Sequence, residues 1–347
     1  EMTSSLVGSE MCIRDRSRVA AGPAGACSPT IGNVAVKVKN LVDQLGRPGP
    51  YDVKVGDLGV TGLPGRIYVP VEGSGGAGRV GRRGRISVPG LVFGHDWCTG
   101  VDAYHVTLRH LASWGIAVAA PDTETGFVTD HAGFAADLES SLQVLTGVKF
   151  GSGTTVTDPD RLYLAGHGMG AGAAVLTAAG RAPAGQDRQN RPSLRGVIAV
   201  YPSDTTPSCY GAARRVETPG LVLDAGRPGT VPAGNASRLA ANWRGPVVYR
   251  RILKGSPAGF SEPILRKALL GGAGPEFGVQ DLLRALMVGF ITGDGALDSS
   301  LSRDCATFHD PETAVKGTAT ATRRELFESL PEFGDPVDKL QQALLKL

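Results

Sequence analysis

The segment 162–179 constrains the fold of this chain more than any other. Its first residues, Leu162 to Ala165, are apolar and typical of a buried strand, and four glycines follow within positions 166–172. From Ala171 to Ala179, small residues continue the chain in a pattern that favours a helix. A buried strand that turns sharply into a helix is a building block of α/β proteins, so the segment predicts a mostly parallel sheet flanked by helices.

The rest of the chain alternates between apolar strands and amphipathic helices. Apolar runs that predict strands lie at 51–71 (two stretches), 86–93, 116–122, 196–201, 220–224 and 247–253. Helical patterns separate them, such as the face formed by Tyr104, Leu108, Leu111 and Trp114. Strands alternating with helices need parallel crossovers, so we expect one sheet of about eight strands over residues 48–292.

Four segments are expected along the chain. They are a scar that resembles translated sequencing-adapter DNA (1–17), an N-terminal segment (18–47), the α/β domain (48–292) and a C-terminal extension (293–347). The extension ends in an amphipathic helix that Asp335 and Pro336 open as N-cap and first helical residue. So short a helix needs a partner surface. We expect it either to pack on the domain or to dock a protein partner.

Composition and charge exclude several classes. The 347 residues include 36 basic and 33 acidic side chains, and the densest basic run, 79–85, has no interleaved aromatics, so nucleic-acid binding is not expected. Five cysteines without C-x-x-C spacing predict neither a metal site nor a disulfide framework, and no cofactor is indicated. No apolar run approaches the ~18 residues of a membrane span. A cytoplasmic location is expected, unless a signal peptide was lost at the artefactual N-terminus.

Gly168 stands where a strand-to-helix turn of this kind carries a nucleophile in many hydrolases. Their G-x-S-x-G nucleophile elbow holds a serine on a strained turn between strand and helix. Here the five positions read Gly166-His167-Gly168-Met169-Gly170. Glycine adopts such a turn without steric cost, but it has no Oγ and cannot form an acyl-enzyme.

The order and spacing of several motifs resemble the α/β-hydrolase superfamily. The motifs are Gly49-Pro50-Tyr51-Asp52-Val53, the strand 65–70, the stretch 111–123, Asp158-Pro159-Asp160-Arg161-Leu162 and the elbow. Within the superfamily the chain is similar to the bacterial cutinase and polyester-hydrolase group, close to dienelactone-hydrolase-like esterases, over about residues 48–292. The resemblance implies an α/β-hydrolase fold and, where the active site is complete, hydrolysis of carboxylic esters.

The resemblance places the three triad positions on residues that cannot perform this chemistry. The nucleophile position is Gly168, the acid position after the strand at Leu221 is Pro228, and the histidine position after the last strand is Ala258. Members of a triad act as a unit, so the loss of all three favours a pseudoenzyme over an active esterase. No catalytic residue is therefore expected, although the fold is that of an ester hydrolase.

The backbone donors of an oxyanion hole do not depend on those side chains. The resemblance places them at the amides of Met169 and Trp97, beside a helix N-terminus that favours anions. A small acyl or carboxylate ligand is therefore expected at a site formed by Trp97, Met169, His95, Asp96 and His167. The indole of Trp97 either stacks on the ligand or packs at the rim, and His167 is expected to serve packing.

An active ester hydrolase with a relocated nucleophile is the alternative. Cys98 lies beside the expected oxyanion loop, where it either pairs as a thiolate with His95 or His105, or is a small buried hydrophobe. Asp204 and Asp224 either supply an acid or serve as loop and turn carboxylates. The sequence leaves these interpretations open.

Overall fold

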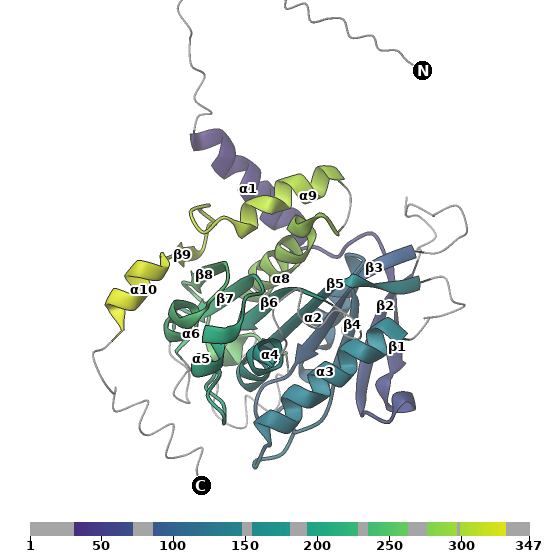
Figure 1. Cartoon of the computed structure of the whole chain (residues 1–347). Coiled ribbons are helices and arrows are strands. Elements are labelled where there is room, and N and C mark those ends of the chain that lie inside the picture. Colours follow the sequence, from purple (N-terminus) through teal and green to yellow (C-terminus); the bar gives the residue numbers. More distant parts are fainter. Residues whose placement is uncertain are drawn as a thin grey trace, which may run out of the picture.

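One large sheet organises the protein (Figure 1). The computed structural model describes residues 31–71, 86–147, 155–180, 193–227, 235–262, 276–296 and 299–330. Within these residues nine strands pair in the order β1-β2-β4-β3-β5-β6-β7-β8-β9. The six strands from β4 to β8 in this order are parallel, whereas β1, β2 and β9 join antiparallel at the edges.

The strands follow one another along the chain with the bounds β1 (Asp52–Asp57), β2 (Gly65–Val71), β3 (Ile86–Gly94), β4 (Ala117–Pro121), β5 (Thr155–His167), β6 (Leu194–Val200), β7 (Gly220–Ala225), β8 (Val247–Ile252) and β9 (Thr318–Thr320). The helices are α1 (Ile31–Leu45), α2 (His105–Ser113), α3 (His131–Gly147), α4 (Met169–Ala179), α5 (Cys209–Ala212), α6 (Ala236–Asn242), α8 (Phe277–Ile291), α9 (Ser299–Cys305) and α10 (Arg323–Ser329). Short helical turns lie at Leu58–Thr61, Val101–Tyr104, Ala213–Arg215, Pro257–Gly259, Thr292–Ala296 and Ala306–His309.

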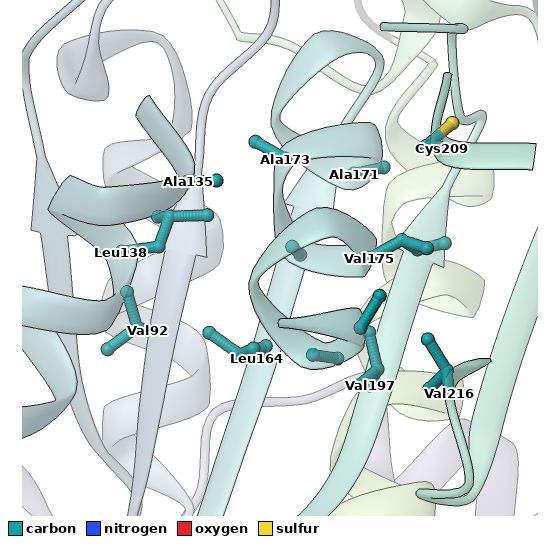
Figure 2. Packing of buried hydrophobic residues seen from close by; sticks show 14 of the residues in the cluster. Val92, Ala135, Leu138, Leu164, Ala171, Ala173, Val175, Val197, Cys209 and Val216 are labelled. Atoms are coloured by element: carbon teal, nitrogen blue, oxygen red, sulfur yellow. The ribbon is translucent and has the colours of Figure 1, made fainter. Parts of the chain in front are cut away.

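Two apolar cores cover the two faces of the sheet. One contains α3, α4 and α6 with the side chains of β3, β5 and β6 that point to them, and the other contains α1, α2 and α8. Figure 2 shows the first core, where Val92, Leu164 and Val197 from three adjacent strands lie under the small residues of α4. Burying both faces explains why the parallel strands read as continuous apolar runs.

The predicted α/β architecture is confirmed, with a mostly parallel sheet flanked by helices. Eight of the nine strands fall within 48–292, as expected from the alternation of apolar runs. The ninth, β9, comes from the segment predicted to be an extension beyond the domain. Three residues of mixed polarity give no periodic signal, so the sequence did not reveal this strand.

The segment after α8 is part of the same packed body. Cys305 and Phe308 are buried in the core that also holds α8, and β9 pairs with β8. Arg250 of β8, itself fully buried, donates to the carbonyl oxygens of Thr313 at 2.8 Å and Asp310 at 3.0 Å. Burial lowers the pKa of this guanidinium to about 10. The helix expected at 335–347 lies outside the described residues.

Helix α1, from the predicted N-terminal segment, packs against α8 and is joined to α2 by a buried histidine. His110 Nε2 lies 2.9 Å from the carbonyl oxygen of Leu45, the last residue of α1. Burial lowers the pKa of His110 to about 4, below its ordinary value of 6.5, so the folded state favours the neutral ring.

This histidine predicts a loss of stability in mild acid. A depressed pKa contributes stability above pH 6.5, and the contribution falls as the pH drops towards 4. We expect wild type to lose about 2 kcal/mol more than His110→Gln between pH 7 and pH 5, because glutamine can still donate to Leu45 but does not titrate. Urea unfolding across this range measures the difference, and parallel profiles for the two proteins would contradict the prediction.

Candidate functional site

The predicted turn between strand and helix is present at Gly168. β5 ends at His167, α4 begins at Met169, and Gly168 between them has φ 53° and ψ −114°. A side chain at such a backbone conformation is strained, which explains the glycine. The Gly168 N–H donates to Val200 O and its carbonyl accepts from Ser203 N–H, both at 3.0 Å, so the turn is fixed against the end of β6.

Close packing accounts for two more glycines of the motif. A Cβ on Gly166 would overlap the backbone of Gly170, and a Cβ on Gly170 would overlap the backbone of Gly94 at the end of β3. The first turn of α4 therefore lies directly on the ends of β3 and β5. This contact brings the loop after β3, which begins with His95 and Asp96, against the Gly168 turn.

The Asp96 side chain fills the space beside Gly168. A Cβ built on Gly168 would overlap the Asp96 carboxyl group, and Asp96 Oδ1 accepts a 2.9 Å hydrogen bond from the Met169 amide. The carboxylate thus lies where the side chain of a serine nucleophile would stand. It also satisfies an N–H group at the start of α4, where negative charge is favoured by the helix dipole.

A buried tyrosine and histidine support this carboxylate. The Tyr104 hydroxyl accepts from the Asp96 N–H at 3.1 Å and lies 2.9 Å from His167 Nδ1. Burial raises the pKa of Tyr104 well above its ordinary value, so the phenol keeps its proton. His167 Nδ1 also lies 3.8 Å from Asp96 Oδ2, a distance at which the two side chains form an ion pair when the ring is protonated.

One of the two donors of the expected oxyanion hole is occupied in this structure. The first donor, the Met169 amide, is bonded to Asp96, and the second expected donor belongs to Trp97 in the tight turn where Thr99 N–H donates to Asp96 O at 3.3 Å. In this conformation the Met169 amide is bonded to Asp96, so binding of a ligand carboxylate to this amide stays a prediction that requires Asp96 to move. The chain supplies that carboxylate itself, because the side chain missing at Gly168 leaves room for Asp96.

His95 and Trp97 flank Asp96 in different environments. His95 is fully buried, with Nδ1 2.9 Å from Asp96 O and Nε2 2.6 Å from Thr123 O, so it ties the loops after β3 and β4 together. Trp97 is 38% exposed, donates from Nε1 to Phe127 O at 2.9 Å, and lies with its ring centroid 4.9 Å from that of Phe127. His95 is structural, whereas Trp97 offers an aromatic surface.

The three triad positions carry no competent set among the described residues. Pro228 lies outside them. Ala258 lies in the Pro257–Gly259 turn, and this turn reaches the elbow, because the Phe260 ring centroid is 5.2 Å from that of His167. Ser256 Oγ, just before the same turn, donates to Glu276 at 2.9 Å. The loop 254–260, where the resemblance predicts the histidine, therefore lies beside the Gly168 turn and contains no histidine.

The other candidate acids are structural. Asp204 Oδ1 accepts from Thr205 N at 2.9 Å and from Ser208 Oγ at 2.8 Å, which fixes the loop before α5. Asp224 accepts from Arg251 Nε at 2.7 Å and from the Tyr249 hydroxyl. Both carboxylates therefore hold local structure, and neither is directed at Gly168 by a recorded bond.

Cys98 lies against a backbone carbonyl oxygen of the loop after β4. Its Sγ lies 3.5 Å from the carbonyl oxygen of Gly126, while both nitrogens of His95 face carbonyl oxygens and His105 Nδ1 lies 3.1 Å from the Tyr68 hydroxyl. Cys98 is half-buried rather than buried, with φ 51°.

Sequence reasoning placed Asp96 in the site but missed its role. The signal was present, since a glycine in place of a larger residue leaves a volume that a neighbouring side chain fills. The roles of Tyr104 and Tyr201 beside His167 were missed as well, because rings from three separate elements meet there. Their ring centroids lie 5.8 and 5.9 Å from that of His167.

Neither a metal centre nor a membrane span is found in the part of the chain that the structure describes. No group of three or more histidine, cysteine, aspartate or glutamate side chains is placed to hold a metal ion. No helix there is sufficiently long and apolar to cross a bilayer. Comparison with models of known protein families finds none that matches the chain, and a search of curated proteins finds no match either.

Proposed function

We propose that this protein is a non-catalytic relative of the α/β hydrolases, a pseudo-hydrolase of the type suggested by its likeness to the bacterial cutinase group. The observation that carries the proposal is the Asp96 carboxylate in the nucleophile's space, bonded to the Met169 amide. The sheet order, the turn at Gly168 and the helix that follows it support the relationship to that fold.

The chemistry of acyl transfer argues against catalysis at this turn. An ester hydrolase needs a nucleophile and free N–H donors where negative charge develops on the substrate oxygen. Here the first donor is occupied, and a fixed carboxylate beside it would repel a developing oxyanion. The histidine position, Ala258, has no basic group. These features together remove nucleophile, base and oxyanion stabilisation.

A binding function is the role that remains for the site. The loop of Asp96 and Trp97 and the turn at Gly168 leave β3 and β5 at their carboxyl ends, where ligands bind in open α/β sheets. β3 continues into α2 on one face and β5 into α4 on the other, so the chain diverges at this point. A protein partner for the helix expected at 335–347 is a second, separate proposal, carried by the sequence alone.

Labelling and turnover test the loss of catalysis. Wild type is expected to show no fluorophosphonate labelling and no hydrolysis of short aryl esters above background. Gly168→Ser alone should restore little, since the serine would have no base and the Met169 amide is bonded to Asp96. Active ester turnover by wild type that disappears in Cys98→Ala would overturn the proposal and identify Cys98 as the nucleophile. A second cysteine variant, Cys209→Ala, is the control because Cys209 is buried away from solvent.

A further inference from the structure

Three apolar side chains are exposed together at the carboxyl end of the sheet. The loop between β4 and α3 carries Phe127 and Val128, and the loop after β3 carries Trp97. The exposed fractions of these residues are 76%, 88% and 38%. The Trp97 and Phe127 rings are in contact, with centroids 4.9 Å apart, and Val128 is the next residue along the chain. The three residues therefore form one surface, which we call the apolar tip.

The backbone beneath the apolar tip is fixed by hydrogen bonds. Glu124 Oε2 accepts from the Asp130 N–H at 2.7 Å and closes the loop at its base. Trp97 Nε1 donates to Phe127 O at 2.9 Å, which ties the tip to the loop after β3 and satisfies the indole N–H. Because this backbone is already ordered, a partner that covers the tip does not have to order the loop, which would weaken binding.

The form and size of the tip fit a fluid apolar phase better than a second protein surface. Phe127 and Val128 are consecutive and both are more than three-quarters exposed, so a partner that touches the tip from one side leaves part of it uncovered. A stable protein interface takes about 20–30 residues a side, whereas the tip offers three. Amphipathic segments at a lipid interface bury their apolar side chains about 5–10 Å into the headgroup boundary, where lipid surrounds them.

The charges around the tip select the kind of lipid surface. The loops 94–104 and 122–131 contain two and three acidic residues and no lysine or arginine. Within the described chain no ion pair joins Glu124 or Asp130, which flank the tip, to a basic side chain. Anionic lipids give a bilayer a negative surface potential, which repels such carboxylates. The tip therefore fits a zwitterionic surface better than an anionic one.

We propose that the apolar tip docks the protein on a zwitterionic lipid surface, with Phe127, Val128 and Trp97 inserted at the headgroup boundary. The carboxylates of Glu124 and Asp130 stay at the level of the headgroups, and the carboxyl ends of β3 and β4 face the lipid. This is peripheral binding by a loop and needs no helix that crosses the bilayer. The inference is independent of the proposed loss of catalysis, because none of these residues occupies a triad position.

Tryptophan quenching by brominated phosphatidylcholine tests insertion in the full chain. Trp97 reports on the tip, because the other two tryptophans, Trp114 and Trp243, are 7% and 1% exposed. We expect brominated vesicles, but not unbrominated ones, to lower the emission. Adding about one third phosphatidylglycerol should weaken binding at least about threefold at low salt. No quenching at about 5 mM lipid, far above what a single acyl anchor needs, or tighter binding to the anionic vesicles, would overturn the inference.

Variants assign the binding to the tip. Val128→Ser leaves the contact between Trp97 and Phe127 intact, and it should lower the partition constant measured by vesicle sedimentation about tenfold, as expected for one apolar side chain no longer buried. Phe127→Ser should lower the constant about tenfold or more for the same reason. Both side chains are exposed, so urea unfolding should show the stability of wild type. Unchanged sedimentation of the two folded variants would place the lipid contact elsewhere and contradict the proposal.

Phe327→Ser is the matched control. Phe327 is 50% exposed on α10, and Arg323 of this helix donates to the carbonyl oxygen of Gly245, just before β8 begins. The control site therefore adjoins the amino ends of the parallel strands, opposite the tip. Phe327→Ser should change the partition constant by less than about twofold, since lipid does not cover this ring. Equal losses in Phe127→Ser and Phe327→Ser would contradict the assignment, whereas ester turnover bears only on the pseudo-hydrolase.

Discussion

Gly168→Ala is expected to lower the free energy of unfolding by roughly 3–6 kcal/mol, a large effect for one methyl group. Strain at a positive φ contributes about 1–3 kcal/mol. Displacing Asp96 from the Met169 amide contributes about another 1.5–3 kcal/mol, as for hydrogen bonds to charged groups. In an Asp96→Ala background only the strain should remain, so the two changes should be coupled by about 2 kcal/mol. Urea unfolding of the four proteins measures this cycle.

Gly62 provides the matched control. It also has a positive φ, 88°, but a Cβ there meets nothing within 4 Å. Gly62→Ala should therefore cost only about 1–2 kcal/mol and should be unaffected by Asp96→Ala. If Gly168→Ala costs the same with and without Asp96, the carboxylate does not occupy the space beside Gly168 in solution.

Rebuilding the triad together with removal of Asp96 should create ester hydrolysis that Gly168→Ser alone cannot. The combined protein carries Asp96→Ala, Gly168→Ser, Pro228→Asp and Ala258→His. Asp96 must be shortened because a side chain at 168 would overlap its carboxyl group. We expect kcat/KM for a short aryl ester to exceed that of Gly168→Ser by at least about 10³, a fraction of the effect of a complete triad. Fluorophosphonate labelling of the serine introduced by Gly168→Ser should accompany the gain.

The protein with the other three changes but Gly168 retained is the control for this gain. It has the base and the acid without a nucleophile, so it should show neither labelling nor turnover. Equal rates for the combined protein and Gly168→Ser would show that positions 228 and 258 do not converge on the turn, and that the alignment of the acid and histidine loops is wrong.

The fold was predictable because local signals agree with it. Continuous apolar runs such as 116–122 indicate strands buried on both faces, and Leu108, Leu111 and Trp114 mark the buried face of α2. Three of the four glycines in 166–172 are explained by the positive φ of Gly168 and by the close backbone approaches at Gly166 and Gly170. Such features depend on sequence spacing, so a single sequence contains them.

The arrangement of the site was less predictable because it depends on contacts between distant elements. Asp96 and Met169 are 73 positions apart, and the side chain of Asp96 enters the turn only because α4 packs against the end of β3. Tyr104 and His167 are separated by 63 positions. No periodicity or spacing rule specifies which rotamer a loop aspartate adopts. The resemblance predicts which positions a triad would use, but it does not predict which side chain lies beside Gly168.

The short strand β9 determines where the chain can be truncated without exposing a sheet edge. It covers the outer edge of β8, and Arg250 holds the loop before it through two carbonyl oxygens. A chain truncated at residue 292, the end of the domain expected from the sequence, would leave β8 unpaired at its outer edge. It would also expose the apolar surface that Phe308 and Val315 now cover. Exposed strand edges of this kind pair with other chains. The segment from Phe308 to β9 therefore contributes to the core and also prevents self-association through the edge of β8.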